Sequence, residues 1–363
     1  MSIKMSKKVV VGMSGGVDSS VAAYLLKEQG YDVIGVTMQI WQDEDECSLE
    51  ENGGCCGLSA VEDARKVARV LDIPYYVMNF KEEFQRDVIE YFKYEYLHGR
   101  TPNPCIACNR YVKWEALLQR SLAIGADYIA TGHYAQIAHL PGGRYAIQNS
   151  VTSAKDQTYA LYNLTQEQLA RTLMPVGAYH KDQIREIASQ IRLPVAHKKD
   201  SQEICFVPDH DYASFIENET GKEMPEGNFV DTSGRVIGRH HGITHYTVGQ
   251  RRGLGIAAGK RIFVLEIRPE TNEVVIGDES DVFSHTVRAD KLNFMGIEDL
   301  PIGKSMDFTG KIRYGHKGAS CTAKRTGEDE LTCYFPESVR AVTPGQALVL
   351  YKDGYVAAGG TIL

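Results

Sequence analysis

Hydrophobic and polar residues alternate along the first half of the chain in two repeating patterns. Short apolar runs typical of buried strands occupy 8–12, 31–38, 73–80 and 126–134. Between them, apolar residues recur every three or four positions and predict helices over 17–30, 59–71, 81–97 and 111–125. Strands that alternate with helices predict a parallel, doubly wound α/β sheet. Ligands of such sheets bind beyond the carboxyl ends of the strands, where we expect residues 12–20, Met38 and Gly132.

The helix predicted over 59–71 carries a start signal of its own. Ser59 and Glu62 have the spacing of a capping box. An acidic segment over 42–54 precedes them. We therefore expect the chain to leave an acidic loop and to enter this helix at Ser59.

The pattern changes after about residue 210. One predicted helix over 209–221 is followed by glycine-rich, strand-like sequence up to Gly277. From about 283 onward short strands and turns alternate, for example over 306–315, 330–335 and 347–363, and they predict a small C-terminal β-barrel. We expect three domains: an α/β domain over 1–210, a small β-rich central domain over 211–282, and the barrel over 283–363.

Composition places the chain among globular proteins. It has 363 residues, of which 43% are hydrophobic and 24% are charged. No stretch approaches the roughly 18 uninterrupted apolar residues of a membrane helix. The first residues, "MSIKMSKKVVVG", are too short and too soon structured for a secretory signal. We expect a cytoplasmic protein without a membrane partner.

Charge points to one local feature. The net charge of −7 argues against a surface coated uniformly for nucleic acid. The segment 235–261 nevertheless has no acidic residue and is a candidate contact for a polyanion, although, taken alone, a solvated face is the better explanation. Its Lys and Arg residues are Arg235, Arg239, Arg251, Arg252, Lys260 and Arg261.

The chain has eight cysteines, and in a cytoplasmic protein of this size we do not expect them to form a framework of structural disulfides. Cys321 and Cys333 lie in strand-like sequence and are expected in the core. Cys47, Cys55 and Cys56 lie in or beside the acidic segment, where structural or surface roles are more typical than a metal site. Cys105, Cys108 and Cys205 lie in motifs described below.

The segment "GMSGGVDSS", residues 12–20, follows a predicted strand and opens a predicted helix. Gly15 and Gly16 would let the backbone approach an anion, and the N–H groups that begin the helix would bind it. Ser14, Ser19 and Ser20 add hydroxyl groups. The loop lacks the lysine of the usual P-loop, so it predicts a phosphate site of another kind; a plain strand–turn–helix connection is the alternative.

Two further motifs carry cysteines. In "GRTPNPCIACNRYVKW", residues 99–114, two prolines precede Cys108, and a helix is expected to begin near Arg110. A cysteine at a helix N-terminus beside Arg110 and Lys113 would favour its thiolate form. In "KDSQEICFV", Cys205 follows Lys198 and Lys199.

The loop resembles the pyrophosphate-loop signature of the ATP pyrophosphatases, which cleave ATP between the α- and β-phosphates and transfer AMP. Because pyrophosphate is the leaving group, the P-loop lysine is not needed. The resemblance implies that Mg²⁺ accompanies ATP, with Asp18 as a candidate ligand. It also implies ATP contacts from Gly12, Met13, Ser14, Gly15, Gly16, Val17, Asp18, Ser19, Met38 and Gly132.

Motifs along almost the whole chain resemble the tRNA 2-thiouridylase family. They include "GMSGGVDSSVAA", "ATGHYA", "KDQTYAL", "DSQEICF", "HHGITHYTVGQRRG", "KIRYGHKG" and "AVTPGQALVLY". The resemblance implies adenylation of the C2 oxygen of the wobble uridine and its replacement by sulfur from a persulfide on Cys205. Cys108 is the implied partner cysteine, and the two end the reaction as a disulfide. The implied products are 2-thiouridine, AMP and pyrophosphate.

The same resemblance implies two partners. One is the anticodon stem-loop of tRNA, contacted also by the central domain, and the other is a sulfur-relay protein that donates the persulfide. Many family members carry Asp where this chain has Cys105, so the role of Cys105 is open. The implied tRNA contacts are Asn103, Pro104, Cys105, His133, Lys155, Asp156, Gln157, Arg313, Tyr314 and Gln346.

Other hypotheses stay beside this one. Cys105, Cys108 and Cys205 are candidate ligands of a [4Fe–4S] cluster with one open iron. Another adenylating pyrophosphate-loop enzyme, with ammonia or an amine as nucleophile, would need no cysteine pair. A non-catalytic nucleotide-sensing or RNA-binding module would release no pyrophosphate, and a purely redox iron–sulfur protein would leave "SGGVDS" unexplained.

Overall fold

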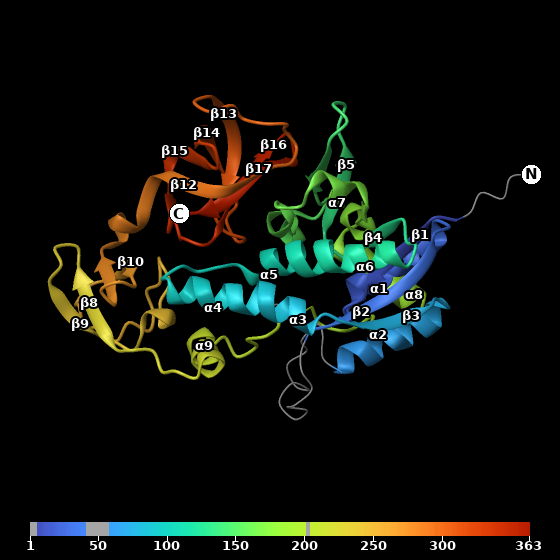
Figure 1. Cartoon of the computed structure of the whole chain (residues 1–363), viewed down its shortest axis with the longest axis horizontal. Helices are drawn as coiled ribbons and strands as arrows, with labels where there is room; N and C mark the ends of the chain where they lie inside the picture. Colours follow the sequence, from blue (N-terminus) through green and yellow to red (C-terminus); the bar gives the residue numbers. More distant parts are fainter. Residues whose placement is uncertain (1–5, 41–57, 201–203) are drawn as a thin grey trace, which may run out of the picture. The chain divides into compact units, whose positions relative to one another are not determined.

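The computed structural model describes residues 6–40, 58–200 and 204–363. The chain forms two compact units (Figure 1). The first comprises Met1–Val88, Cys105–Pro208 and Gly354–Val356, and the second comprises Ile89–Pro104, Asp209–Asp353 and Ala357–Leu363. The acidic segment 42–54, with Cys47, and also Cys55 and Cys56 lie outside the described residues, so the expectations for them stay untested.

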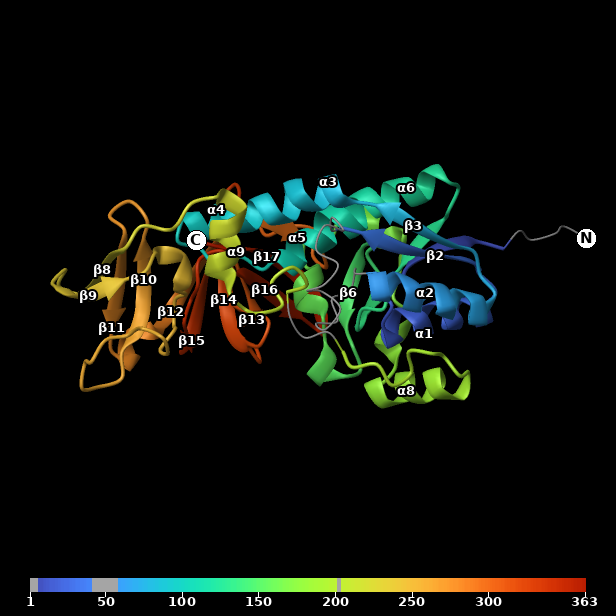
Figure 2. The same cartoon turned by 90° about the horizontal axis from the view of Figure 1, so that it is seen from below.

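A five-stranded parallel sheet organises the first unit, as the sequence predicts. Its strand order is β3-β2-β1-β4-β7. The central strand is buried completely at Val9, Val10 and Val11, because helices cover both faces of the sheet. Helices α1 and α2 lie on one side and α6 on the other (Figure 2). The strands are Lys8–Gly12 (β1), Asp32–Gln39 (β2), Tyr75–Asn79 (β3), Tyr128–Ala130 (β4) and Thr172–Leu173 (β7).

The predicted helices of the first unit are present, but some begin or end at other residues than predicted. Helix α2 begins at Leu58, so Ser59 lies inside the helix and does not cap it. Helices α7 and α8 and the hairpin formed by β5 and β6 were not predicted. The bounds are Val17–Glu28 (α1), Leu58–Leu71 (α2), Lys81–Phe84 (α3), Leu118–Ala123 (α6), Gln166–Ala170 (α7), Lys181–Gln190 (α8), Ala135–His139 (β5) and Tyr145–Asn149 (β6).

The helix predicted over 111–125 begins much earlier. Helix α5, Pro104–Ala107, continues into a π-helical segment, Cys108–Leu117, and then into α6. Proline at the first helical position loses no hydrogen bond there, which explains this start. A second π-helical segment, Gln85–Ile89, joins α3 to α4, Glu90–Leu97, so the helix predicted over 81–97 is confirmed as one continuous helical stretch.

The second unit contains the small β-rich domain that the sequence predicts. Helix α9, Tyr212–Thr220, is capped by Asp211, whose carboxylate accepts the Ser214 N–H, and it ends at Gly221 with a left-handed backbone. Four strands then form a sheet of order β10-β11-β8-β9. They are Gly227–Asp231 (β8), Val236–His240 (β9), Phe263–Arg268 (β10) and Glu273–Gly277 (β11).

Six strands form the predicted C-terminal barrel. Their order is β12-β15-β14-β13-β16-β17, and pairing between β12 and β17 closes the sheet on itself. Cys321 and Cys333 lie in its core, at 3% and 0% exposure, as expected. The strands are Phe283–Phe294 (β12), Ser305–Lys311 (β13), Ala319–Gly327 (β14), Glu330–Arg340 (β15), Ala347–Lys352 (β16) and Tyr355–Ile362 (β17).

Within the described ranges, no helix combines the length and the apolar character needed to cross a membrane.

Candidate active site

The glycine loop lies where the order of the parallel sheet reverses, between β1 and β4. Strand β1 ends at Gly12 and α1 begins at Val17. Gly15 has a φ of +67°, and a Cβ there would lie 2.4 Å from the Ala60 carbonyl oxygen. A Cβ on Gly132, just after β4, would lie 2.5 Å from the Ser19 nitrogen. Both glycines are required by close packing, and both lie at the switch point where doubly wound sheets bind ligands.

Hydroxyl groups inside the loop fix its shape. Ser20 Oγ donates to the Gly16 carbonyl at 2.7 Å, and Ser19 Oγ accepts the Ser14 N–H at 3.2 Å. Ser19 and Ser20 are buried, whereas Ser14 is exposed. Ser14 Oγ also lies 3.3 Å from Ser19 Oγ, so all three serines take part in hydrogen bonds within the loop.

Asp18, at the second position of α1, lies at the centre of an ion-pair network. Both its carboxylate oxygens accept from Lys181 Nζ, at 2.7 and 2.8 Å. The Tyr134 hydroxyl also donates to Asp18, at 2.8 Å. Lys181 continues to Asp200 at 2.8 Å. A chain of alternating charges thus connects the start of α1 to Asp200, which belongs to the motif "DSQEICF" that contains Cys205.

Asp200 collects three cations. Besides Lys181, it pairs with Lys155 at 2.9 Å and with Arg185 at 3.1 Å. Burial alone would raise the pKa of Asp200, but the hydrogen bonds from Lys155 and Lys181 outweigh it and lower the pKa to about 2. Asp200 is therefore charged at neutral pH.

Tyr134 is the neutral member of the network. Burial raises the pKa of its hydroxyl, and the charge of Asp18 and the hydrogen bond to it raise that pKa further. The hydroxyl therefore stays protonated and donates a hydrogen bond to Asp18. Sequence reasoning missed Tyr134, Lys181, Arg185 and Asp200 as site residues; the available signal was the i, i+4 spacing of Lys181 and Arg185, which places both on one face of α8.

A separate cation supports the loop from another side. Lys198 Nζ donates to the Gly15 carbonyl at 3.2 Å and pairs with Asp63 of α2 at 2.8 Å. Four cations, Lys155, Lys181, Arg185 and Lys198, therefore belong to the loop or to the network around Asp18. Such an arrangement stabilises negative charge brought to this end of the sheet.

Two of the other expected nucleotide or tRNA residues lie near the same strand ends. Met38 is half-buried on β2, in register with Met78 of β3. The His133 imidazole lies 2.7 Å from Thr131 Oγ1 and beside Trp114. Burial, and then the charge of Lys113, lower the pKa of His133 well below its usual value, so the ring is neutral.

The residues of "KDQ", expected to contact tRNA, have partners inside the first unit. Lys155 binds Asp200, as described. Asp156 accepts the Ser150 N–H at 2.9 Å, and Gln157 Oε1 accepts the Tyr134 N–H at 2.8 Å. Lys155 and Gln157 of the triplet thereby help to hold Asp200 and Tyr134 in place.

Cys105 and Cys108 lie on the first turns of one helical stretch. Cys105 is exposed and Cys108 is half-buried. Because the helix begins at Pro104, Cys108 lies in its second turn, and the prediction that it lies at a helix N-terminus is wrong. Lys113 donates to Asn109 Oδ1 at 2.9 Å, and buried Asn109 donates to the Ala160 carbonyl.

Cys205 is half-buried and belongs to the same unit as Cys108. The next residue, Phe206, is buried and packs edge-to-face against Phe84 of α3, with ring centroids 5.7 Å apart. Helix α3 also packs against the π-helical segment that begins at Cys108. Both cysteine-bearing segments are thus anchored on one helix.

The part of the chain that the structure describes holds no group of three or more His, Cys, Asp or Glu side chains suited to a metal. A [4Fe–4S] cluster held by Cys105, Cys108 and Cys205 is therefore not shown, and it stays a hypothesis. Mg²⁺ is less demanding, since one or two carboxylates together with nucleotide phosphates hold it in many enzymes. Asp18 fits that donor set.

The remaining expected tRNA residues lie in the second unit. Gln346 Nε2 donates to the Thr101 carbonyl at 2.7 Å, which brings Gln346 to the segment containing Asn103 and Pro104. Arg313 Nη1 donates to the Arg340 carbonyl at 2.6 Å, and Tyr314 beside it is 49% exposed.

Three family models match consecutive parts of the chain. They are described as a tRNA methyl transferase HUP domain over residues 7–209, a tRNA methyl transferase PRC-barrel domain over 213–278, and an aminomethyltransferase beta-barrel domain over 284–362. Their order is that of the α/β domain, the small β-rich domain and the barrel.

Curated relatives match over almost their full length. A protein of Lachnoclostridium phytofermentans named tRNA-specific 2-thiouridylase MnmA is 67% identical over 357 residues, which cover 98% of this chain and 99% of that protein. A protein of the same name from Clostridioides difficile is 54% identical over 360 residues, covering 99% and 98%. One from Acetivibrio thermocellus is 56% identical over 358 residues, covering 98% and 99%.

Proposed function

The chain belongs to the family of tRNA-specific 2-thiouridylases, which are tRNA-modifying transferases, and we propose that it replaces the C2 oxygen of the wobble uridine of tRNA with sulfur. One observation carries the proposal beyond family membership. The glycine loop and both cysteine-bearing segments belong to one compact unit, in which α3 anchors the segments of Cys108 and Cys205. The chemistry needs a phosphate site and two thiols within reach of one pyrimidine.

ATP is the proposed activating substrate. Backbone N–H groups of the loop that contains Gly15 and Gly16 would bind its phosphates, with Met38 and Gly132 beside the adenosine. The cations around Asp18 and Asp200 would stabilise the charge of departing pyrophosphate. Bound Mg²⁺ would supply further positive charge on the phosphates, and Asp18, after exchanging its contact with Lys181, is the carboxylate that would hold it.

The proposed reaction has three steps, and in each one a bond forms and a bond breaks. The C2 oxygen of uridine attacks the α-phosphorus of ATP, and pyrophosphate leaves. The terminal sulfur of a Cys205 persulfide attacks C2, and the bond from C2 to the adenylated oxygen breaks to release AMP. The Cys108 thiolate then attacks the inner sulfur of Cys205, which frees 2-thiouridine and leaves a Cys108–Cys205 disulfide for an external dithiol to reduce.

The partners follow from this chemistry. A sulfur-relay protein must deliver the persulfide sulfur to Cys205, and the anticodon stem-loop must present an unstacked uridine. We propose that residues 1–210 perform activation and sulfur transfer. Residues 211–282 and 283–363 would hold the RNA, with Arg313, Tyr314 and Gln346 among the contacts.

The experiment is nucleoside analysis by mass spectrometry of tRNA incubated with ATP and a persulfide source. Wild-type protein should form 2-thiouridine together with AMP and pyrophosphate. Cys108→Ser and Cys205→Ser should each reduce product by at least about 1,000-fold, as loss of a covalent catalyst does. Cys105→Ser, on the same helical stretch, is the comparison variant: as a residue that contacts tRNA but carries no covalent step, Cys105 should affect KM for tRNA, and its variant should keep kcat within about twofold.

Other results would identify the competing functions. A Cys108→Ser variant with full turnover would indicate an adenylating enzyme that uses an amine or ammonia. Methylated instead of thiolated uridine would support the chemistry named in the descriptions of the first two family models. Nucleotide binding without pyrophosphate release would indicate a non-catalytic sensor.

A further inference from the structure

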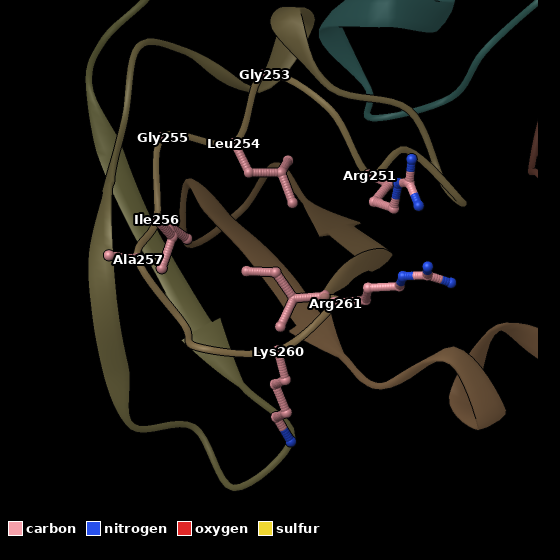
Figure 3. Close-up of a pocket in the computed structure, with 9 residues that line it drawn as sticks. Arg251, Gly253, Leu254, Gly255, Ile256, Ala257, Lys260 and Arg261 are labelled. Atoms are coloured by element: carbon pink, nitrogen blue, oxygen red, sulfur yellow. The ribbon is translucent and has the colours of Figure 1, made fainter.

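A pocket in the central domain has no residue among the ATP, sulfur-transfer or tRNA contacts named above, although its Arg251 and Gly253 belong to the motif "HHGITHYTVGQRRG". It has a volume of about 440 Å³ and is formed mainly by the loop between β9 and β10 (Figure 3). This size falls in the range of small-ligand sites, roughly 300–1,000 Å³. Its lining residues are Arg251, Gly253, Leu254, Gly255, Ile256, Ala257, Lys260, Arg261 and Ile262.

The pocket has an apolar wall and a cationic edge. Leu254 and Ile262 are 6% and 9% exposed and belong to the core of the central domain, and Ile256 packs against that core. In Figure 3 the side chains of Arg251 and Arg261 extend in the same direction, whereas Lys260 points elsewhere. An apolar surface next to two guanidinium groups suits a ligand with a flat, weakly polar part and an anionic part.

Ion pairing separates the basic residues of 235–261 into two groups. Arg235 pairs with Asp231, Arg239 with Glu226, and Lys260 with Asp278. Arg251 and Arg261 are exposed, and neither has an ion pair with any carboxylate in the described ranges. Their charges are therefore available to an external anion.

Two more arginines extend this cationic edge within the second unit. The Arg340 guanidinium lies 5.2 Å from the ring centroid of Phe263, the residue after Ile262, and Arg340 Nη2 reaches the Gly249 carbonyl at 3.5 Å. Arg313, in turn, donates to the Arg340 carbonyl. Arg340 thus connects residues next to the pocket loop, Gly249 and Phe263, with the barrel loop that carries Arg313 and Tyr314, and several cations in this unit suit a polymer with repeated phosphates better than a single small anion.

We propose that this pocket binds one nucleotide of the tRNA substrate: Arg251 and Arg261 hold a backbone phosphate, and Leu254, Ile256 and Ile262 contact the attached nucleoside. The inference rests on the proposed function for the identity of the RNA. It adds a subsite in the central domain, remote in sequence from both cysteines. An arginine guanidinium forms bidentate hydrogen bonds with phosphate, and apolar side chains pack against the face of a ribose or base.

The test measures tRNA affinity in the absence of ATP and sulfur donor, across a series of salt concentrations. Arg251→Gln and Arg261→Gln should each weaken tRNA binding by about 5- to 10-fold and reduce the slope of log K against log salt by about 1, as loss of one phosphate contact does. Arg251→Lys and Arg261→Lys should retain the slope, because the charge is retained. Ile256→Ser should weaken binding without changing the slope.

Arg235→Gln is the matched control, since it removes the same charge from the same domain at an ion-paired position. It should change affinity by less than about twofold. Wild-type affinity and slope in both Arg251→Gln and Arg261→Gln would overturn the proposal, and would leave an acidic protein surface as the occupant to consider. If the wild type forms no 2-thiouridine while these variants still lose tRNA binding, the proposed reaction fails and the subsite stands.

Discussion

The ion-pair network around Asp18 and the arginine pocket of the central domain use positive charge in opposite ways. Around Asp18, Lys155, Lys181 and Arg185 are all paired with carboxylates, and the pairs interlock. In the pocket, Arg251 and Arg261 have no such partners in the described ranges. Paired charges hold fixed positions, which suits a reaction that needs oriented groups; unpaired charges exchange counterions for phosphates, which suits binding of a polyanion.

The comparison also explains why the net charge of the chain does not indicate whether it binds nucleic acid. A net charge of −7 argues against nucleic acid only if the basic residues are evenly neutralised. Here the neutralisation is uneven: each cation of the Asp18 network pairs with a carboxylate, whereas Arg251 and Arg261 at the pocket edge have no carboxylate partner in the described ranges. The following four predictions test this difference, from the largest expected effect to the smallest.

Removing a cation from the network should cost far more stability than removing one from the pocket. Lys181→Met leaves Asp18 and Asp200 facing each other without the ammonium between them, and we expect about 2–3 kcal/mol of destabilisation. Arg261→Gln, at an exposed and unpaired position, should change stability by less than about 0.5 kcal/mol. Urea unfolding of both variants measures the difference, and equal losses would contradict the contrast.

The glycine loop offers a sharper pair within one motif. Position 15 has a positive φ, and Gly15→Ala would place a Cβ against the Ala60 backbone. We therefore expect this variant to lose at least about 2 kcal/mol of stability and to lose ATP binding. Gly16 has a φ of −99°, and the Cβ introduced by Gly16→Ala would approach only Ser14 Oγ, at 3.5 Å. It should cost less than about 1 kcal/mol. Thermal unfolding with and without ATP distinguishes the two, and similar behaviour would contradict this geometry.

Asp200 predicts an acid-sensitive contribution to stability. Its pKa falls from the usual 3.8 to about 2 on folding, so its charged form stabilises the native state above about pH 4, and this contribution is lost as pH falls toward 2. The shift corresponds to about 2 kcal/mol at neutral pH. Asp200→Asn should flatten that part of the pH–stability curve. Asp231→Asn, at the half-buried end of β8, should change the curve less, and its effect should be larger at low salt than at high salt.

His240 should also make the protein less stable at lower pH, by a smaller amount than Asp200. It is fully buried in the central domain, where Nδ1 accepts the Gly242 N–H and Nε2 lies 3.1 Å from the Asn272 carbonyl. Burial lowers its pKa below 6.5, so the unfolded chain binds the proton first and stability falls as pH drops below about 6.5. His240→Gln should remove this slope between pH 5 and 7 in urea unfolding. An unchanged slope would place the titrating group elsewhere.

The sequence predicted most of the fold because its strongest signals are local. The parallel sheet followed from apolar runs separated by helical periodicity, and the barrel followed from evenly spaced short strands. The helix start at Pro104 was not predicted, although proline at the first helical position is a recognised start signal. The hairpin of β5 and β6 had a signal too, in the Pro-Gly-Gly turn at 141–143.

The candidate site was predictable only where a motif is contiguous. Gly15, Gly16 and Asp18 belong to one short segment, whereas Lys181 lies 163 residues away from Asp18 and joins it only through the packing of α8 on α1. Charge pairing of this kind has no signature along the chain. For the same reason the segment 235–261 reads as uniformly basic, and only the structure separates its paired residues from Arg251 and Arg261.

The most direct test of the central claim follows the oxygen atom. An anticodon stem-loop synthesised with ¹⁸O at C2 of the wobble uridine would be incubated with ATP and a persulfide source, and the released AMP analysed by mass spectrometry. If the C2 oxygen is adenylated and then displaced by sulfur, each 2-thiouridine is matched by one AMP that carries ¹⁸O. Thiolation with unlabelled AMP, or AMP release without thiolation, would contradict the account.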